Sequence, residues 1–115
     1  MACDFCDIIA GKRNADIIWQ NERVIIFKDI HPQARIHLLV CPKAHHPAFS
    51  ETPNDEVAYL FKVCRKLAET TEVEDGFKLV IHNGPQGGQI IFHLHVHFMS
   101  QIKSLGSQTV DMTID

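Results

Sequence analysis

The sequence predicts an α+β domain in which about five mainly antiparallel strands pack with one long helix and a short N-terminal helix. Three observations support this fold class. Several short apolar runs have strand character, only one long segment repeats its apolar residues at helical spacing, and most connections are too short for the crossovers of parallel strands. The 115 residues contain no repeat or linker, so we expect a single domain, 1–115.

The first elements are short and separated by turns. A helix is expected over 6–10 and stops near Gly11. Strands over 17–19 and 24–27, joined by the turn Asn21-Glu22, have the pattern of a hairpin.

The middle of the chain contains another strand and the long helix. Pro32 disfavours helix in the residue before it, and a strand is expected over 36–41. Thr52 is expected to cap a helix that runs to about Thr70, with Pro53 at its first position. The apolar residues that recur there at helical spacing are Val57, Leu60, Phe61, Cys64 and Ala68.

The last third contains two strands around a glycine-bearing loop. Strands are expected over 77–82 and 91–99, with the loop over 83–89 between them. The tail, 100–115, is polar and weakly patterned.

Charge and composition exclude several classes of partner. The net charge is −3 and the basic residues are scattered, so polymeric nucleic acid is not expected to bind. No segment resembles a leader or a membrane span, which favours a cytoplasmic protein without a membrane partner. In that compartment the four cysteines are expected to be reduced, with Cys41 and Cys64 packed inside the protein.

The run 93–99, His-Leu-His-Val-His-Phe-Met, is the most informative feature of the chain. On a strand its three imidazoles share one face, while the apolar residues between them face the core. The outer rings would lie about 13 Å apart, too far to bind one ion without a bend in the strand. We therefore expect the three rings to have more than one role; the alternative is an amphipathic strand that merely carries histidines.

The preceding loop has glycines at 84, 87 and 88, which let backbone N–H groups approach an anion. A plain hairpin turn would use the same residues. With the histidines directly after the loop, a bound phosphate would meet imidazole nitrogens, and a neutral histidine is nucleophilic near pH 7. The pattern favours attack by an imidazole on phosphorus.

The run 93–99 fits the signature of the histidine triad (HIT) family, and three further blocks resemble that family, most closely its Hint-like branch. These blocks are Asp29-Ile30-His31-Pro32-Gln33-Ala34, His37-Leu38-Leu39-Val40-Cys41-Pro42-Lys43 and Gly87-Gly88-Gln89. The resemblance covers residues 3–99. It implies a HIT-like fold, a homodimer, and hydrolysis or transfer at the α-phosphorus of a purine nucleotide conjugate, such as a phosphoramidate or a dinucleotide polyphosphate.

The resemblance also implies roles for single residues. His95 would be the nucleophile that forms a covalent nucleotidyl intermediate, and His97 and His37 would stabilise charge on the phosphoryl oxygens. Asp29 would accept hydrogen bonds from the ribose hydroxyls, although it could simply cap a turn. The other implied nucleotide contacts are Ile9 and Ile30 beside the base, both of which could be core residues, and Asn83, Gly88 and Gln89 near the phosphate.

One position departs from the family pattern. Ile90 follows Gln89 where the Hint-like branch usually has serine or threonine. Loss of a hydroxyl donor near developing charge predicts a slow hydrolase or a different leaving-group preference.

The pair Cys3-x-x-Cys6 could be half of a zinc site, a redox pair or two incidental thiols. Members of the family with this N-terminal motif imply a structural zinc completed by His45 and His93. His46 is a rival to His45, while His31 and His82 are expected to be ordinary loop or strand-end residues.

Three hypotheses follow from the sequence. The leading one is the nucleotide hydrolase or transferase. The second is a nucleotide-binding regulatory or scaffold protein with little turnover, which Ile90 favours. The third is a zinc-dependent hydrolase whose histidines are catalytic ligands.

Overall fold

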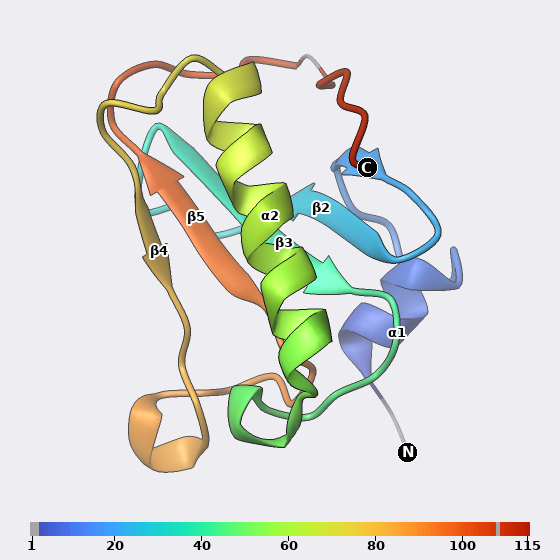
Figure 1. The fold of residues 1–115 in the computed structure, drawn as a ribbon. Helices are drawn as coiled ribbons and strands as arrows, with labels where there is room; N and C mark the ends of the chain where they lie inside the picture. The colour runs from blue at the N-terminus through green and yellow to red at the C-terminus, as the bar shows by residue number, and fades with distance from the viewer. Residues whose placement is uncertain (1–2, 108) are drawn as a thin grey trace.

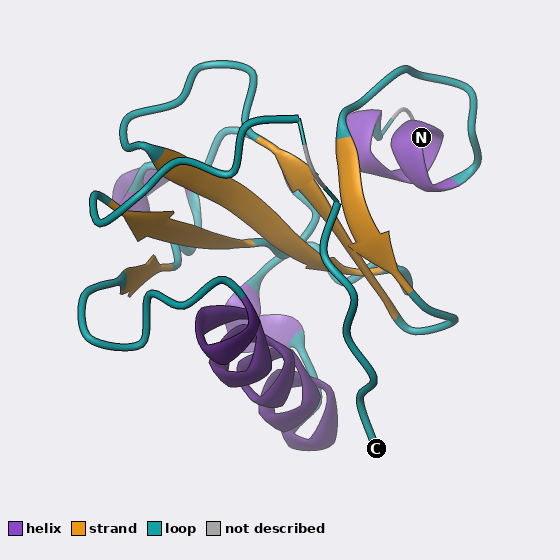
Figure 2. Cartoon of the chain, turned by 90° about the horizontal axis from the view of Figure 1, so that it is seen from above, coloured by secondary structure: helices purple, strands orange, loops and turns teal. Residues whose placement is uncertain are grey.

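The computed structural model describes residues 3–107 and 109–115, which form a five-stranded antiparallel sheet with a helix on each face (Figures 1 and 2). The strand order β1-β2-β3-β5-β4 makes β3 central and leaves β1 and β4 at the edges. The predicted fold class is confirmed. The elements are α1 (Asp4–Ile9), β1 (Ile17–Gln20), β2 (Val24–Lys28), β3 (Ile36–Pro42), α2 (Asn54–Thr70), β4 (Lys78–Val80) and β5 (Val96–Ser100), with 3₁₀ turns η1 (Phe49–Glu51) and η2 (Pro85–Gly87).

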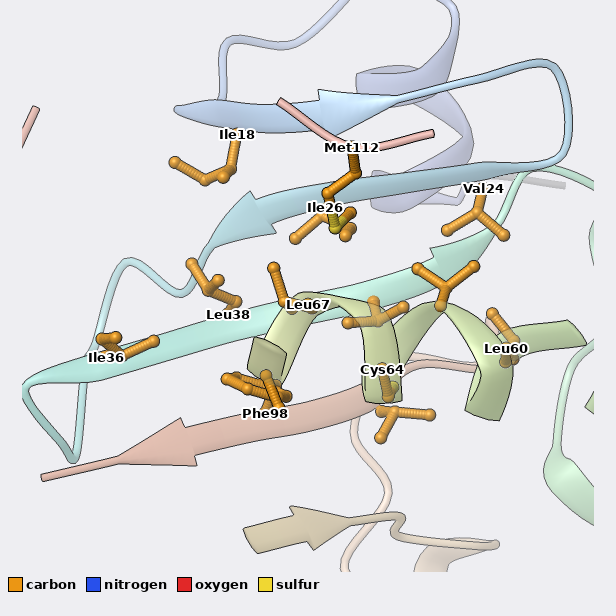
Figure 3. Close-up of a cluster of buried hydrophobic side chains, with 14 of the residues drawn as sticks. Ile18, Val24, Ile26, Ile36, Leu38, Leu60, Cys64, Leu67, Phe98 and Met112 are labelled. Carbon is orange, nitrogen blue, oxygen red and sulfur yellow. The ribbon is translucent and has the colours of Figure 1, made fainter. Parts of the chain in front are cut away.

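Alternate residues of the central strands pack against different helices. Val24 and Ile26 of β2 belong to the larger cluster with α2, whereas Ile25 and Phe27 belong to a second cluster with α1. Figure 3 shows the α2 side, where Leu60 lies between the helix and the sheet. The α1 side is smaller and is the face that carries the candidate site. Its buried apolar residues are Phe5, Ile8, Ile25, Phe27, Leu39 and Cys41.

The histidine-bearing strand is shorter than the predicted range 91–99. β5 begins at Val96 because the segment before it bends, and the His95 ring turns back so that its Nδ1 lies 2.7 Å from the main-chain oxygen of His93. The ring of His93 consequently reaches the N-terminal segment. The rings of His95 and His97 remain neighbours, with centroids 5.1 Å apart.

Other element boundaries also differ from the prediction. α1 begins at Asp4 because Cys3 caps it, with its Sγ accepting the N–H of Cys6 at 3.2 Å. The N-cap of α2 is Pro53 rather than Thr52, whose hydroxyl instead donates to the Ala48 carbonyl at 2.7 Å. β4 is shorter than the expected strand 77–82 because only Lys78–Val80 pairs with β5.

The tail adds no strand or helix over its described residues but is tied to β1. The indole Nε1–H of Trp19 donates to the Met112 carbonyl at 3.0 Å, and the N–H of Val110 donates to the Ile18 carbonyl at 3.2 Å. Met112 is buried in the larger cluster, and Figure 2 shows the tail running past the sheet toward α2. Within the described ranges, none of the helices has the length and apolar content needed to cross a membrane.

Candidate functional site

A cavity of about 410 Å³ opens on the α1 side of the sheet. This volume lies within the range of small-molecule binding sites. The lining residues come from α1 and the segment after it, from the end of β2 and the loop after it, from β3, and from the stretch between β4 and β5 together with β5 itself. Those named as candidates from the sequence are Asp29, Ile30, Gly88, Gln89, His95 and His97, and the others are Asp4, Phe5, Ile8, Arg13, Asn14, Ala15, Phe27, Lys28, His31, Gln33, Leu39, His82, Ile90 and Ile91.

The hydrogen bonds of His95 fix which of its ring nitrogens carries the proton. The acceptor 2.7 Å from Nδ1 is the main-chain carbonyl of His93, so Nδ1 is the N–H donor. The lone pair of the neutral ring is therefore on Nε2. His95 can act as a nucleophile through this atom.

The imidazoles of His37 and His97 form a proton-ordered pair. The backbone N–H of Gln33 donates to His37 Nδ1 at 3.0 Å, so neutral His37 carries its proton on Nε2. That Nε2 lies 2.9 Å from His97 Nδ1 and 3.3 Å from a carboxylate oxygen of Asp29. Donation to His97 Nδ1 leaves the proton of His97 on Nε2. His97 can then offer an N–H to a ligand in the cavity.

Burial keeps these three imidazoles neutral near pH 7. It lowers the pKa of His95 and of His37 from the ordinary value. For His97, burial and the neighbouring imidazoles of His95, His37 and His82 lower the pKa to about 4, against the opposing effect of Asp29. Of these three rings, His95 therefore offers a lone pair and His97 an N–H donor to the cavity, and none of the three is a cation near pH 7.

Asp29 lies where β2 ends. One carboxylate oxygen accepts the backbone N–H of His31 at 2.9 Å, and the other approaches His37 Nε2. Asp29 thus caps a turn and also lines the cavity. Ile30, beside it, is 83% exposed and forms part of the cavity wall.

The glycine loop is held by the side chain of Gln89, which is buried. Its oxygen accepts the N–H of Gly84 at 2.8 Å, and its nitrogen donates to the carbonyls of Pro47 and Ile91 at 2.7 and 3.0 Å. Gly88 has φ +88°, a conformation that strains residues with a Cβ. Gln89 therefore shapes the loop with polar atoms that are already engaged by the protein.

Three sequence candidates lie elsewhere than expected. His37 is buried outside the described cavity wall and reaches the cavity only through its contact with His97. The described cavity wall includes Ile8 rather than Ile9, which packs against the smaller cluster. Asn83 is exposed, and its side-chain oxygen accepts the backbone N–H of Ser50 at 2.9 Å instead of lining the described cavity.

Sequence reasoning missed several residues of the site. The ring of His82, expected to be an ordinary strand-end residue, lies 5.2 Å from that of His97 and lines the cavity. Gln33 acts through its backbone N–H, for which a sequence carries no signal. Phe5 could have been found from its helical spacing with Ile8 and Ile9.

A second group of side chains joins the N-terminal segment to the sheet. The ligand atoms of Cys3, Cys6, His45 and His93 all lie within 4.8 Å of one another. Cys6 Sγ is 3.2 Å from His45 Nδ1, and Cys3 Sγ is 3.5 Å from His93 Nδ1. Two thiols and two imidazoles are the donor set of a closed zinc site.

The hydrogen bond of His93 suits this group to a metal. Its Nε2–H donates to the Pro42 carbonyl at 2.7 Å, which leaves the lone pair on the Nδ1 that faces the sulfurs. Burial, followed by the effect of Cys3, raises the pKa of Cys6 to about 11, so a metal must displace the thiol proton when it binds. Of the rival imidazoles, His45 joins the group, whereas within the described chain His46 Nε2 is buried without a hydrogen-bond partner.

Asp29, His37 and His97 also lie within 4.8 Å of one another, but their hydrogen bonds do not suit a metal. The Nδ1 of His37 is occupied by the Gln33 N–H and its Nε2 carries the proton, so neutral His37 has no free lone pair. The hypothesis of a catalytic metal on these histidines therefore lacks a suitable ligand atom on His37.

Comparisons with known proteins agree with this architecture. The model of the HIT domain family matches residues 10–104. A HIT-like protein of Chlamydia pneumoniae is 40% identical over 98 residues, which cover 83% of this chain and 89% of the relative. A HIT family hydrolase from Legionella pneumophila Philadelphia 1 superposes with a TM-score of 0.81 at 32% identity, covering 86% of this chain and 92% of that one. A Zn-bound histidine triad family protein from Mycobacterium smegmatis superposes with a TM-score of 0.77 at 29% identity, covering 99% of this chain and 85% of that one. Because the family model matches most of the chain and the fold agrees over most of its length, the protein belongs to the histidine triad (HIT) family.

Proposed function

We propose that the chain is a nucleotide hydrolase or transferase that acts at the α-phosphorus of nucleoside phosphoramidates or related nucleotide conjugates through a covalent nucleotidyl-histidine. The observation that carries this proposal is the Nε2 lone pair of neutral His95, on a ring that lines a cavity of nucleotide size.

The proposed reaction has two displacements. His95 Nε2 attacks the α-phosphorus, the bond from phosphorus to the leaving group breaks, and the leaving group takes a proton from water. Water then attacks the same phosphorus, breaks the P–N bond, releases the nucleoside monophosphate and returns the lone pair to His95. The Nε2–H of His97, oriented through His37, would donate to a phosphoryl oxygen in both steps.

The nucleoside is proposed to lie against the opposite wall. Asp29 has a carboxylate oxygen at 3.3 Å from His37 and would accept ribose hydroxyls. Ile30 supplies apolar surface for the base, with Ile8 in the place that the sequence suggested for Ile9. Gly88 and Gln89 would shape the phosphate side of the cavity, whereas Asn83 would act only through the position of its loop.

We also propose a structural zinc on Cys3, Cys6, His45 and His93. Their thiol and imidazole donor set and the tautomer of His93 support it, as does the Zn-bound relative. When bound, zinc would supply four bonds that cross-link the N-terminal segment to the sheet. It would take no part in the transfer at His95.

A homodimer belongs to the same proposal. β4 is an edge strand of three residues, and the outward face of α2 exposes Phe61, so both offer surface to a second copy. Light scattering at micromolar concentration tests this, with a mass of one chain as the contrary result.

One observation favours the second candidate, a nucleotide-binding protein with little turnover. Ile90 is 87% exposed on the cavity wall, where its side chain offers no hydrogen-bond donor to a leaving group.

The test is to mix the protein with adenosine 5′-phosphoramidate, quench, and measure covalent nucleotidyl adduct and released AMP. We expect both with the wild type and neither with His95→Ala. His46→Ala, which removes an imidazole outside the described cavity wall, is the control for folding. Nucleotide binding without adduct or AMP would support the second candidate and contradict the first.

A further inference from the structure

His93 belongs to two parts of the molecule at once. Its Nδ1 faces the sulfurs of Cys3 and Cys6 at 3.5 and 3.6 Å, and its Nε2–H is held by the Pro42 carbonyl. Its own main-chain carbonyl accepts the Nδ1–H of His95 at 2.7 Å. A single residue thus connects the metal-ligand group to the bond that sets the tautomer of the proposed nucleophile.

Phe5 provides a second connection. It lies between the two cysteines and is buried, with ring centroids 5.0 Å from His95 and 6.0 Å from His93, both edge to face. It also meets Phe27 of the sheet at 5.2 Å. The ring that supports His95 is therefore carried by the same turn of chain that carries the thiols.

That turn of chain also forms a wall of the cavity. Asp4, Phe5 and Ile8, all of α1, line it. α1 has only six residues, and a helix of that length is not stable by itself in water. The position of α1 therefore depends on its packing in the smaller apolar cluster and on the interactions of Cys3 and Cys6 with the imidazoles of the metal-ligand group.

We propose that occupancy of the Cys3, Cys6, His45 and His93 centre is thermodynamically coupled to occupancy of the nucleotide cavity, with Phe5 and His93 as the positioning residues. This inference rests on the proposed function. A metal that holds α1 in place keeps Phe5 against His95 and completes the wall that a nucleotide contacts. Coupling between two sites is reciprocal, so a bound nucleotide must increase metal affinity by the same factor.

A purely structural metal predicts something different. It would raise the stability of the fold but leave the nucleotide affinity of the folded chain unchanged. It would also leave the tautomer of His95 unchanged, because the His93 carbonyl would keep its position whether or not the metal is bound. Measurements of nucleotide affinity and of the His95 tautomer on folded protein therefore distinguish coupling from a purely structural role of the metal.

The experiment titrates AMP, with GMP as a second probe, into zinc-loaded and chelated protein by calorimetry, and titrates Zn²⁺ against a competing chelator with and without saturating AMP. Circular dichroism monitors the fold. We expect AMP to bind about tenfold more weakly after chelation and Zn²⁺ to bind more tightly with AMP by the same factor. Long-range ¹H–¹⁵N spectra should show the Nδ1–H form of His95 in the loaded protein and a mixture of tautomers after chelation.

Phe5→Ala tests the connection itself. The zinc-loaded variant is expected to keep one zinc per chain but to bind AMP about tenfold more weakly than the wild type, with little further change on chelation. Phe49→Ala, a matched truncation of an exposed ring outside the described cavity wall and the metal-ligand group, should behave as the wild type. Because Phe5 also lines the cavity, weaker AMP binding in the zinc-loaded variant is expected from the lost wall contact alone. The loss of the further change on chelation is the result that assigns the effect to the coupling.

The contrary outcomes are distinct. Equal AMP affinity in folded loaded and chelated protein overturns the coupling, as does a zinc-loaded Phe5→Ala variant with wild-type AMP affinity and an unchanged His95 tautomer. If neither AMP nor GMP binds the zinc-loaded wild type, the proposed function itself fails, and the coupling falls with it.

Discussion

Acid is expected to destabilise the fold through His97. Burial and the adjacent imidazoles lower its pKa to about 4, and its side chain is only 16% exposed. The pKa of an unfolded histidine is about 6.5. Between these two values the unfolded chain binds a proton that the folded chain excludes, so stability falls as the pH falls from 6.5 toward 4.

The magnitude follows from the same pKa values. A pH of 5 lies about 1.5 units below the pKa of His97 in the unfolded chain and above its pKa in the folded chain. Each unit of this difference corresponds to about 1.36 kcal/mol. The titration of His97 alone should therefore lower the free energy of unfolding by at most about 2 kcal/mol at pH 5 relative to pH 7.5. Most carboxylates are still ionised at pH 5, which keeps their contribution small.

The assay is urea unfolding at pH 7.5, 6.5, 5.5 and 5.0 for the wild type and for His97→Asn, which keeps a polar side chain without the titrating ring. Between pH 7.5 and 5.0, the free energy of unfolding of the wild type should fall by about 2 kcal/mol more than that of the variant. Above pH 7, the free energies of unfolding of the two proteins should depend on pH in the same way. His31→Asn removes an exposed imidazole and should follow the wild type. Parallel pH profiles for wild type and His97→Asn would refute the reasoning, because they would show that His97 titrates alike in both states.

Three further predictions concern the cavity rim, its loop and the metal-ligand group. Ile90→Ser should raise kcat for a nucleoside phosphoramidate about tenfold by adding a hydroxyl donor beside the leaving group, whereas Ile90→Ala should not; equal effects of the two would contradict the donor argument. Gln89→Leu should lower the free energy of unfolding by about 2–4 kcal/mol in urea, because three backbone groups lose their partner, and a loss no larger than that of the exposed Gln86→Leu would count against this. Chelation should lower the Tm of the wild type by at least about 5 °C and leave Cys3→Ser unaffected; a Tm independent of chelator in both would argue against a structural metal.

Local patterns were sufficient to predict most of the elements. The helical repeat from Val57 to Ala68 corresponds to α2, because one buried face requires a fixed period of apolar residues. The short apolar runs over 24–27 and 36–41 correspond to β2 and β3, which are buried on both faces. The same logic failed at the triad. Its alternation predicts a strand from 91, but the segment before Val96 bends so that one imidazole can leave the row.

The sequence by itself determined which chemical groups the protein has and where the chain can turn: three imidazoles at two-residue spacing, a glycine loop before them and a pair of thiols near the N-terminus. Only the tertiary structure decided how those groups are used. A carbonyl 51 positions away sets which nitrogen of His93 keeps its lone pair, and a ring 60 positions away sets which nitrogen of His97 carries its proton. A thiol 39 positions away decides the use of His45 rather than His46. A hydrogen bond depends on a distance of about 3 Å and on direction, and for partners so far apart in sequence only the packing of the sheet and helices fixes both.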